Sequence, residues 1–342
     1  MTDVDLLVVG GGPVGLAAAI EARLAGLSVV VCEPRTGPVD KACGEGLMPG
    51  AVRLLARIGV DPPGPDLTGI RYVGGALAVE HRFRSGPGRG VRRTALHAEL
   101  AARAADVGVQ TVRTRVGLVR QDPEGVTVTG ELHARWLFAC DGLHSSIRRQ
   151  LGLQRLPHRP ARYGVRRHFR VAPWSDAVEV HWTPDAEVYV TPVGQDLVGV
   201  AVLGHRDVDY ERVLDSAPAV RERLRGTVPA SDLRGAGPMW QGTVRRTAGR
   251  ILLVGDAGGY VDALTGEGIR LGLAQARAAV AAVAAGRPGD YERAWRRESR
   301  DYRMLTAALV TAAQRRRIRR RIVPLARRLP RVYGAIVDRL AA

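Results

Sequence analysis

Three glycines near the start of the chain have the spacing G-x-G-x-x-G: Gly10, Gly12 and Gly15. They follow an apolar run, Val4–Val9, and precede an alanine-rich stretch, Leu16–Ala25. Between a strand and a helix, such glycines permit a tight turn, close approach of a pyrophosphate, and close packing of helix on strand. Gly12, Pro13 and Val14 would open the helix, whose positive N-terminus favours a phosphate.

An acidic residue follows at a distance that suits this motif. Glu33 lies 21 positions after Gly12, at the end of a second apolar run that starts at Ser28. A carboxylate at that place can accept hydrogen bonds from ribose hydroxyls. Glycines also serve plain turns, so the motif alone is weak evidence. The strand, the helix and the spaced acid together predict that a dinucleotide binds here, without showing which one.

The composition excludes some classes of protein. The chain has 342 residues, 46% of them hydrophobic, which is enough for one large domain or two intertwined domains. Its net charge of +17 comes almost entirely from arginine, and Lys41 is the only lysine. The arginines are scattered and few aromatic residues lie among them, so we interpret the charge as a codon bias and expect no nucleic-acid partner.

The sequence also predicts a cellular location. We find no apolar run of the ~18 residues needed to span a bilayer, and Val4–Val9 is too short for a signal peptide. Cys32, Cys43 and Cys140 are far apart and form no metal-type pair. We therefore expect reduced thiols and a cytoplasmic protein.

Strand and helix patterns indicate how the chain is divided. Helices are expected at residues 50–58, from Thr94 as a plausible N-cap onward, at 208–224 and at 268–285, and strands at 67–84, 109–119 and throughout 163–203. Strand–helix alternation at both ends around a β-rich middle predicts an α/β fold. The expected architecture is a Rossmann-like dinucleotide-binding domain split in sequence (1–66, 91–158 and 245–285), an inserted, mostly antiparallel substrate domain (67–90 and 159–244), and a C-terminal helical segment (286–342).

Two further motifs lie far from the glycines. Cys140-Asp141-Gly142 follows a buried strand, and Gly255-Asp256-Ala257 follows another, with Asp262–Ile269 (DALTGEGI) shortly after it. In this order the three motifs resemble the FAD-dependent monooxygenase superfamily, of the type built like aromatic hydroxylases and geranylgeranyl reductases. The resemblance covers about residues 1–60, 91–150 and 245–285.

The resemblance implies a set of FAD contacts. Asp256 would bind the ribityl chain, Arg35 and Arg93 would reach the dinucleotide, and Val116 would contact adenine through its backbone. The amides at the start of the helix near Gly266 would stabilise the anionic reduced flavin. The full set of expected cofactor-binding residues is Gly10, Gly12, Pro13, Val14, Gly15, Glu33, Pro34, Arg35, Arg93, Val116, Asp141, Asp256, Gly266, Gly268 and Ile269. Singly, Asp141-Gly142 could be a plain turn, Asp256 a helix N-cap and Arg93 a surface arginine.

The Cys43-Gly44-Glu45-Gly46-Leu47 loop resembles a Cys-Gly-rich loop that lies against the flavin in geranylgeranyl reductase-like proteins. It implies that Cys43 and Glu45 face the flavin or the substrate, whereas a free cysteine is also commonly a buried packing residue. Tyr189 is the third candidate catalytic residue. It lies in a segment that keeps only the last proline of the Tyr-x-Trp-x-Phe-Pro pattern of these reductases. Ala263 stands where the family's flavin motif has proline.

The substrate is expected on the sheet of residues 163–203, where polar and aromatic side chains recur. The candidates there and nearby are Arg166, Arg167, His168, Tyr189 and Trp240. We interpret His168 as a structural histidine, because it alternates with apolar neighbours. The halogenase pattern Gly-Trp-x-Trp-x-Ile-Pro does not occur, so halogenation is not expected.

The C-terminal segment carries an apolar stripe at helical spacing: Ile318, Ile322, Leu325, Leu329, Val332, Ile336 and Leu340. Arginines occupy much of the opposite face, and Pro324 and Pro330 are expected to break the run into shorter helices. One interpretation is a basic amphipathic element that touches anionic lipid. The other, which we favour as the commoner role of a charge run, is a helical cap with its arginines in water.

These observations lead to one expected function and two alternatives. The first is an FAD-dependent monooxygenase of secondary metabolism that hydroxylates a hydrophobic aromatic or polyketide-like metabolite. It would use NAD(P)H as a transient reductant, and O2 through a flavin C4a-hydroperoxide. The second is a flavin-dependent reductase of isoprenoid or acyl double bonds. The third is a non-catalytic FAD-containing protein at a membrane surface.

Overall fold

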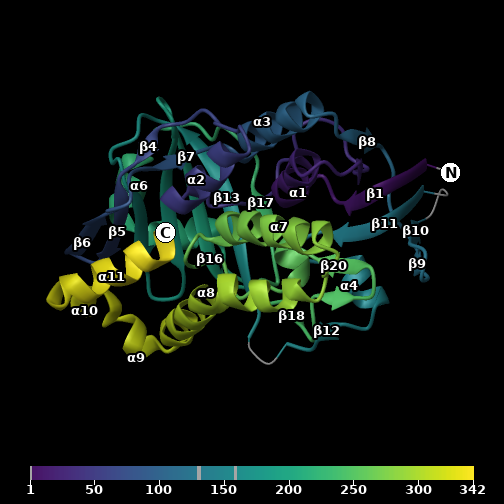
Figure 1. Ribbon diagram of the computed structural model, residues 1–342. Coiled ribbons are helices and arrows are strands. Elements are labelled where there is room, and N and C mark those ends of the chain that lie inside the picture. Colours follow the sequence, from purple (N-terminus) through teal and green to yellow (C-terminus); the bar gives the residue numbers. More distant parts are fainter. Residues whose placement is uncertain (1, 129–131, 158–159) are drawn as a thin grey trace.

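Two large sheets, covered by helices, form the body of the protein (Figure 1). The computed structural model describes residues 2–128, 132–157 and 160–342. The first sheet belongs to the α/β part of the chain and the second to the β-rich middle. The expected fold class, an α/β protein with a Rossmann-like unit, antiparallel sheets and C-terminal helices, is confirmed. The expected domain limits stay a prediction.

The first sheet has a parallel centre in the order β20-β11-β1-β2-β8. Strand β19 extends it antiparallel to β20, and β9 and β10 add an antiparallel hairpin beside β11. The bounds are β1 Thr2–Val9, β2 Val29–Cys32, β8 Gln110–Val112, β9 Val119–Gln121, β10 Val126–Val128, β11 Leu132–Ala139, β19 Thr247–Ala248 and β20 Ile251–Leu253.

Helices α1 (Pro13–Leu24), α3 (Arg93–Asp106) and α7 (Gly268–Ala284) cover one face of this sheet. Their small side chains let them pack closely: a Cβ at Gly272 of α7 would lie 2.3 Å from Val14 of α1. Strand β1 is buried on both faces, with Leu6 and Val8 in one core cluster and Leu7 and Val9 in another. This explains its continuous apolar run, which is typical of a central parallel strand.

The second sheet has the order β17-β13-β16-β15-β14-β5-β6. All its pairs are antiparallel except β14 with β5. The bounds are β5 Gly69–Gly74, β6 Leu77–Arg82, β13 Arg162–Arg170, β14 Val178–Trp182, β15 Glu187–Gly194, β16 Leu197–His205 and β17 Arg234–Ala236.

Alternation along the strands of the second sheet gives it two different faces. Val188 and Val190 of β15 pack against α5 (Tyr210–Asp215) and α6 (Pro218–Arg223). Tyr189 and Thr191, the residues between and after them, point to the other face and line a central cavity. The sheet is therefore both a core element and one wall of the cavity.

The remaining elements frame this body. Short strands form a three-stranded sheet, β3 (Gly46–Leu47), β7 (Gly88–Gly90) and β4 (Asp66–Leu67), and a two-stranded one, β12 (Gln154–Arg155) with β18 (Gly242–Thr243). Further helices are α2 Pro49–Arg57, α4 Ser146–Gln150 and the single turn η1 Gly255–Gly258. The chain ends in α8 Asp290–Gln314, α9 Arg316–Arg319, α10 Ile322–Arg328 and α11 Pro330–Ala341.

Some local expectations were wrong. Thr94 is not the N-cap of α3: the helix already includes Arg93, and its cap position, Arg92, makes no side-chain capping bond. Residues 109–119 form no single strand, because residues 113–118 between β8 and β9 are irregular. Pro330 does begin α11. Pro324 lies in the first turn of α10, where backbone N–H groups have no partner within the helix, so a proline, which lacks an N–H, is tolerated.

Candidate active site

The glycine turn between β1 and α1 has the close contacts that its motif predicts. Gly10 has a φ of 106°, and a Cβ there would lie 2.5 Å from the carbonyl oxygen of Cys140. A Cβ at Gly15 would lie 1.9 Å from the carbonyl oxygen of Gly10. At Gly12, by contrast, a Cβ would meet only the Arg93 guanidinium, at 3.8 Å, within the central cavity. Gly10 and Gly15 are thus required by the fold, whereas Gly12 leaves space for a ligand.

Glu33 ends β2 next to this turn. Its carboxylate accepts a hydrogen bond from the amide of Gly11 at 2.9 Å and is paired with the Arg35 side chain at 2.7 Å. Burial opposes ionisation, but the hydrogen bonds from Arg35 and Gly11 outweigh it and lower the pKa of Glu33. The carboxylate is therefore ionised at neutral pH, and its expected contact with a ribose stays a prediction. His97 of α3, which the sequence analysis missed, holds the turn from the other side, with Nε2 2.9 Å from the Gly11 carbonyl.

The turns that carry Asp141 and Asp256 are joined by a buried arginine, Arg148 of α4. Its guanidinium donates to the carbonyls of Asp256, Ala257 and Leu143 and to the side chain of Gln241, over 2.7–3.3 Å. It thereby fixes the turn after β11 against the turn after β20. Nothing in the sequence around Arg148 indicates this role. Only the structure reveals it, because the Arg148 side chain is fully buried.

Asp141 and Asp256 both line the cavity. One Asp141 oxygen accepts the Ser146 amide at 2.8 Å, while Oδ1 is buried with no hydrogen-bond partner among the described residues. No described residue hydrogen-bonds the Asp256 carboxylate. Its pKa is raised by burial, against the lowering effect of Lys41, Arg93 and Arg148. Both side chains therefore have acceptors left over for a bound hydroxyl-rich ligand.

The segment before α7 forms the far side of the cavity. Gly266 has a φ of 72°, and Gly266, Gly268 and Ile269 line the cavity at the positive end of a 17-residue helix. Glu267 in this segment is buried, which raises its pKa to about 7 despite its pairing with Arg270. Despite the alanine at 263, the segment makes an ordered turn, because the Leu264 amide donates to Asp262 at 3.0 Å.

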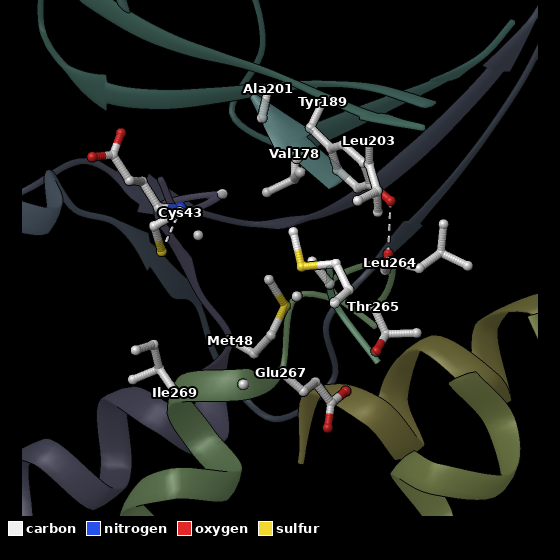
Figure 2. A pocket seen from close by; sticks show the side chains of 18 of the residues that line it. Cys43, Met48, Val178, Tyr189, Ala201, Leu203, Leu264, Thr265, Glu267 and Ile269 are labelled. Atoms are coloured by element: carbon white, nitrogen blue, oxygen red, sulfur yellow. Dashed lines mark hydrogen bonds between the residues drawn. The ribbon is translucent and has the colours of Figure 1, made fainter. Parts of the chain in front are cut away.

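The whole cavity has a volume of about 600 Å³, and it continues from these residues into an apolar chamber (Figure 2). Its walls come from the residues just before α2, the second sheet and the segment before α7, with Met48, Val178, Ala201, Leu203 and Leu264 around the space. Tyr189 lines it too, but its hydroxyl donates to the Leu264 carbonyl at 2.9 Å. Burial holds the pKa of Tyr189 well above its usual range. The tyrosine is therefore neutral, and its hydrogen bond joins the second sheet to the segment before α7.

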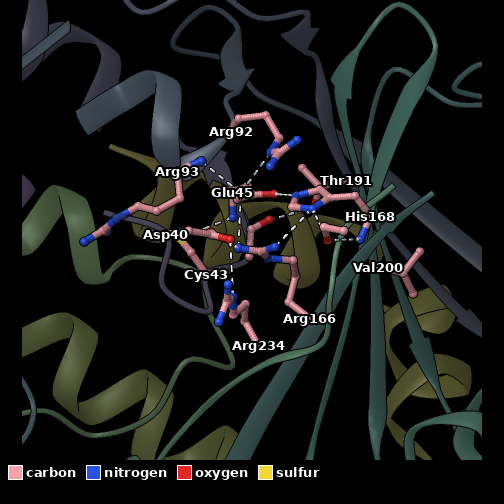
Figure 3. Close-up of polar contacts among 12 residues, drawn as sticks. Asp40, Cys43, Glu45, Arg92, Arg93, Arg166, His168, Thr191, Val200 and Arg234 are labelled. Carbon is pink, nitrogen blue, oxygen red and sulfur yellow. Dashed lines mark hydrogen bonds and ion pairs between the residues drawn. The ribbon is translucent and has the colours of Figure 1, made fainter. Parts of the chain in front are cut away.

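The Cys43 loop lines the cavity. Polar contacts of Glu45 hold the loop in place (Figure 3). Glu45 is the only non-glycine residue with a positive φ, 59°, among the described residues. Its buried carboxylate accepts the Arg93 amide at 2.9 Å and lies 2.5 Å from Nε2 of His168. The Cys43 sulfur accepts the Glu45 amide at 3.4 Å. The loop thus holds a thiol in the cavity above a buried polar cluster.

The same cluster continues from His168 into the second sheet. The His168 ring bonds Ser231 at 2.8 Å and lies 3.0 Å from the Arg166 guanidinium, which pairs with Asp40. His168 is completely buried, as expected of a structural histidine. Arg167 points away toward Glu211, and Trp240 does not line the cavity. Glu45 itself lines the cavity, but its carboxylate is held by the Arg93 amide and His168, so its catalytic role stays a prediction.

The expected cofactor residues fit FAD. Gly12 faces open space, Asp141 and Asp256 keep free acceptors, and the start of α7 faces the same cavity, so a pyrophosphate, a ribityl chain and a flavin edge each have a partner. Pro13, Val14, Arg35 and Arg93 line the cavity as well. Gly15 and Glu33 act from behind the turn, Pro34 is exposed, and Val116 is buried in the core below the sheet. The adenine contact of Val116 stays a prediction.

Comparison with known proteins agrees with FAD binding. The family model described as FAD binding domain matches residues 3–293. The menaquinone reductase of Mycolicibacterium smegmatis is 34% identical over 329 residues, covering 86% of this chain and 80% of that protein. The rifampicin monooxygenase of Streptomyces venezuelae is 30% identical over 300 residues, covering 80% of this chain and 62% of that protein. The flavin-dependent brominase Bmp2 has the same fold, with a TM-score of 0.83 at 18% identity over 99% of this chain and 94% of that chain.

The chain therefore belongs to the FAD binding domain family, within the superfamily of FAD-dependent monooxygenases and reductases. It is a flavin-dependent oxidoreductase by family. Among its described helices, none has the length and apolar character required to cross a bilayer.

Proposed function

We propose that this protein is an FAD-dependent reductase that saturates a carbon–carbon double bond in a long, lipophilic, isoprenoid-like chain. The observation that carries the proposal is the shape and lining of the cavity. It runs from the Cys43 loop and the start of α7 to the C-terminal helices, and aliphatic side chains line most of the chamber beyond the cofactor residues. Such a space suits a hydrocarbon chain better than a phenolic ring, which would need polar partners to orient it.

Saturating a double bond consumes a hydride and a proton. Bound FAD, reduced by NAD(P)H, would supply the hydride. The Cys43 thiol lies in the cavity and can donate the proton, to be recharged from water. Glu45 and His168 hold the loop so that the thiol stays in place, and the apolar walls exclude water from the reacting carbon. The menaquinone named for the Mycolicibacterium relative is itself a lipid with an isoprenoid chain, which supports this substrate class.

The loss of the reductase aromatic pattern around Tyr189 argues against a close copy of the geranylgeranyl reductase site. The structure offers a partial answer, because Tyr189 still lines the chamber and its ring is fixed by Leu264. The wall of the chamber near Tyr189 has fewer aromatic side chains than the reductase pattern, but it is otherwise apolar.

A second candidate is hydroxylation of a hydrophobic metabolite. An enclosed apolar chamber that excludes water also suits this chemistry, which needs an aligned substrate rather than a dedicated acid or base. A monooxygenase also stands among the relatives.

One experiment separates the two reactions. The FAD-loaded protein is incubated with a polyprenyl lipid and NAD(P)H, with and without oxygen, and the product is examined by mass spectrometry. A gain of two hydrogens without oxygen supports the reductase. A gain of one oxygen atom that requires air identifies the hydroxylase instead. FAD binding with no turnover of any lipophilic substrate, under either atmosphere, contradicts both and leaves the non-catalytic interpretation.

A further inference from the structure

The apolar stripe of the C-terminal helices borders the cavity. All seven of its residues, Ile318, Ile322, Leu325, Leu329, Val332, Ile336 and Leu340, belong to the cavity lining. Several are nevertheless open to water: Leu325 is 55% exposed, Val332 53% and Leu329 48%. The stripe is thus the rim of an opening.

Other residues anchor these helices to the body. Val323, Tyr333 and Val337 are buried, and the Tyr333 hydroxyl donates to the Ile70 carbonyl at 3.0 Å. Helices α10 and α11 lie along β5 and β6 at the edge of the second sheet (Figure 1). The exposed aliphatic side chains are therefore not needed to hold the helices in place, and they form an unpartnered apolar face.

A strong positive charge surrounds this face. Between residues 315 and 331 the chain has nine arginines and no Asp or Glu. Two of them have acidic partners: Arg316 lies near Asp185, and Arg319 is buried against Glu187. The other seven are exposed and have no ion pair with any described residue: Arg315, Arg317, Arg320, Arg321, Arg327, Arg328 and Arg331.

We propose that α9–α11 dock on an anionic lipid bilayer. Leu325, Leu329, Val332 and Ile336 would enter below the headgroups, and the seven arginines would contact lipid phosphates. The cavity would then open toward the acyl chains, so a lipid-soluble substrate enters without crossing water. Only this entry route rests on the proposed reductase function; the docking itself does not.

The charge argues against a second copy of this chain as the partner. A symmetric dimer through this face would place one arginine cluster against the same cluster of the other copy. Aliphatic insertion also distinguishes a bilayer from a nucleic acid, because residues 315–342 contain a single aromatic residue, Tyr333, and it is buried. A lipid surface satisfies both the charge and the apolar stripe.

The test is flotation of the FAD-loaded full chain with vesicles of phosphatidylcholine, with and without phosphatidylglycerol. We expect binding only to the anionic vesicles, weakened by salt. Substitution of Arg327, Arg328 and Arg331 together by Ser should lower the partition coefficient about 100-fold, since each arginine near an anionic surface contributes roughly a factor of five. Leu325→Ser with Val332→Ser should reduce binding while retaining the salt dependence.

A matched control removes the same charge elsewhere. Arg120, Arg155 and Arg245 are exposed and unpaired among the described residues, on or beside β9, β12 and β18, far from α10 and α11 (Figure 1). Their triple substitution by Ser should leave vesicle binding unchanged. Equal loss in both triple variants, no binding to anionic vesicles, or a dimer that the Leu325/Val332 variant dissociates would each overturn the proposal. None of these outcomes depends on turnover, so docking and reductase function can fail separately.

Discussion

The Glu45 carboxylate lies 2.5 Å from Nε2 of His168, although 123 residues separate the two in sequence. This contact joins the Cys43 loop to the middle of β13, so the loop is fixed on the substrate sheet rather than on its own neighbours. The left-handed backbone of Glu45 is a conformation that a glutamate adopts only when its surroundings hold it there. The pair therefore sets where the thiol of Cys43 sits.

Breaking this pair should destabilise the protein and weaken its activity. For Glu45→Ala or His168→Ala we expect a loss of about 3–5 kcal/mol in the free energy of unfolding, because each leaves a buried polar partner alone. The double variant should cost clearly less than the sum of the two single ones, with a coupling of about 2 kcal/mol. Urea denaturation of the four proteins measures this cycle.

The control for that cycle is Glu99→Ala on the exposed face of α3, where Glu99 has no ion pair with a described residue. It should change stability by less than about 0.5 kcal/mol. Additive losses in the double variant would show that Glu45 and His168 act independently.

The three glycines of the first turn should respond differently to alanine. Gly15→Ala should prevent correct folding, because the new Cβ would lie 1.9 Å from the Gly10 carbonyl oxygen. Gly12→Ala should fold normally, because its Cβ meets nothing closer than Arg93 at 3.8 Å. It should raise the Kd for FAD at least ~10-fold, because the methyl group occupies the space next to the pyrophosphate. Circular dichroism and FAD fluorescence titration separate the two effects; unchanged FAD affinity in Gly12→Ala would contradict the assigned phosphate site.

Glu267 should make the protein less stable as the pH rises. Burial raises its pKa from 4.5 to about 7, so between these values the folded state holds a proton that the unfolded state has lost. The free energy of unfolding should therefore fall by about 3 kcal/mol from pH 4.5 to pH 7 and depend no further on this group above it. Asp262, whose pKa burial raises to about 6, adds a smaller change of the same sign.

In Glu267→Gln the larger part of this pH dependence should disappear, leaving the part due to Asp262. Denaturant midpoints measured across the range for both proteins make the comparison, with Glu99→Gln as the control that keeps the full dependence. An unchanged slope in Glu267→Gln would mean that the carboxylate is already ionised in the folded state.

The three cysteines should differ in their reaction with iodoacetamide. Cys43 lies half-buried in the cavity, whereas burial raises the pKa of Cys32 to about 11 and holds that of Cys140 well above its usual range. Since the thiolate is the reactive form and burial disfavours it, Cys32 and Cys140 should both be alkylated more slowly than Cys43. Peptide mass spectrometry with time gives the order, and bound FAD should slow the labelling of Cys43. Faster labelling of Cys32 would contradict this order, and no protection of Cys43 by FAD would place the cofactor elsewhere.

The parts of the site that are local in sequence could be predicted from it. The turn at Gly10, Gly12 and Gly15 with Glu33 follows from a strand, a helix and a strand in immediate succession. Its contacts join residues that the β1–α1–β2 unit brings together by itself. The family resemblance then placed Asp141, Asp256 and Gly266 at one cavity, and the structure does so.

Contacts between distant segments could not be predicted in this way. Nothing near Arg148 in the sequence shows that it will bind the carbonyls of Asp256 and Ala257, 108 and 109 positions later. The spacing of the C-terminal stripe predicted an amphipathic helix, but no periodicity could show that its apolar face would border the cavity instead of filling a core. Thr94 is not the cap because α3 already begins at Arg93, and residue preferences locate a helix end only to within about one or two residues.

The two ends of the cavity differ in polarity. Its cofactor half includes the exposed Arg35 after β2, and its apolar half is bordered by Val332 and its neighbours on α11. With the C-terminal helices on a bilayer, electrons would arrive from a water-soluble donor at one half and leave into an oil-soluble acceptor at the other. The protein would then transfer electrons from the aqueous phase to the lipid phase, and donor and acceptor would never have to dissolve in the same medium.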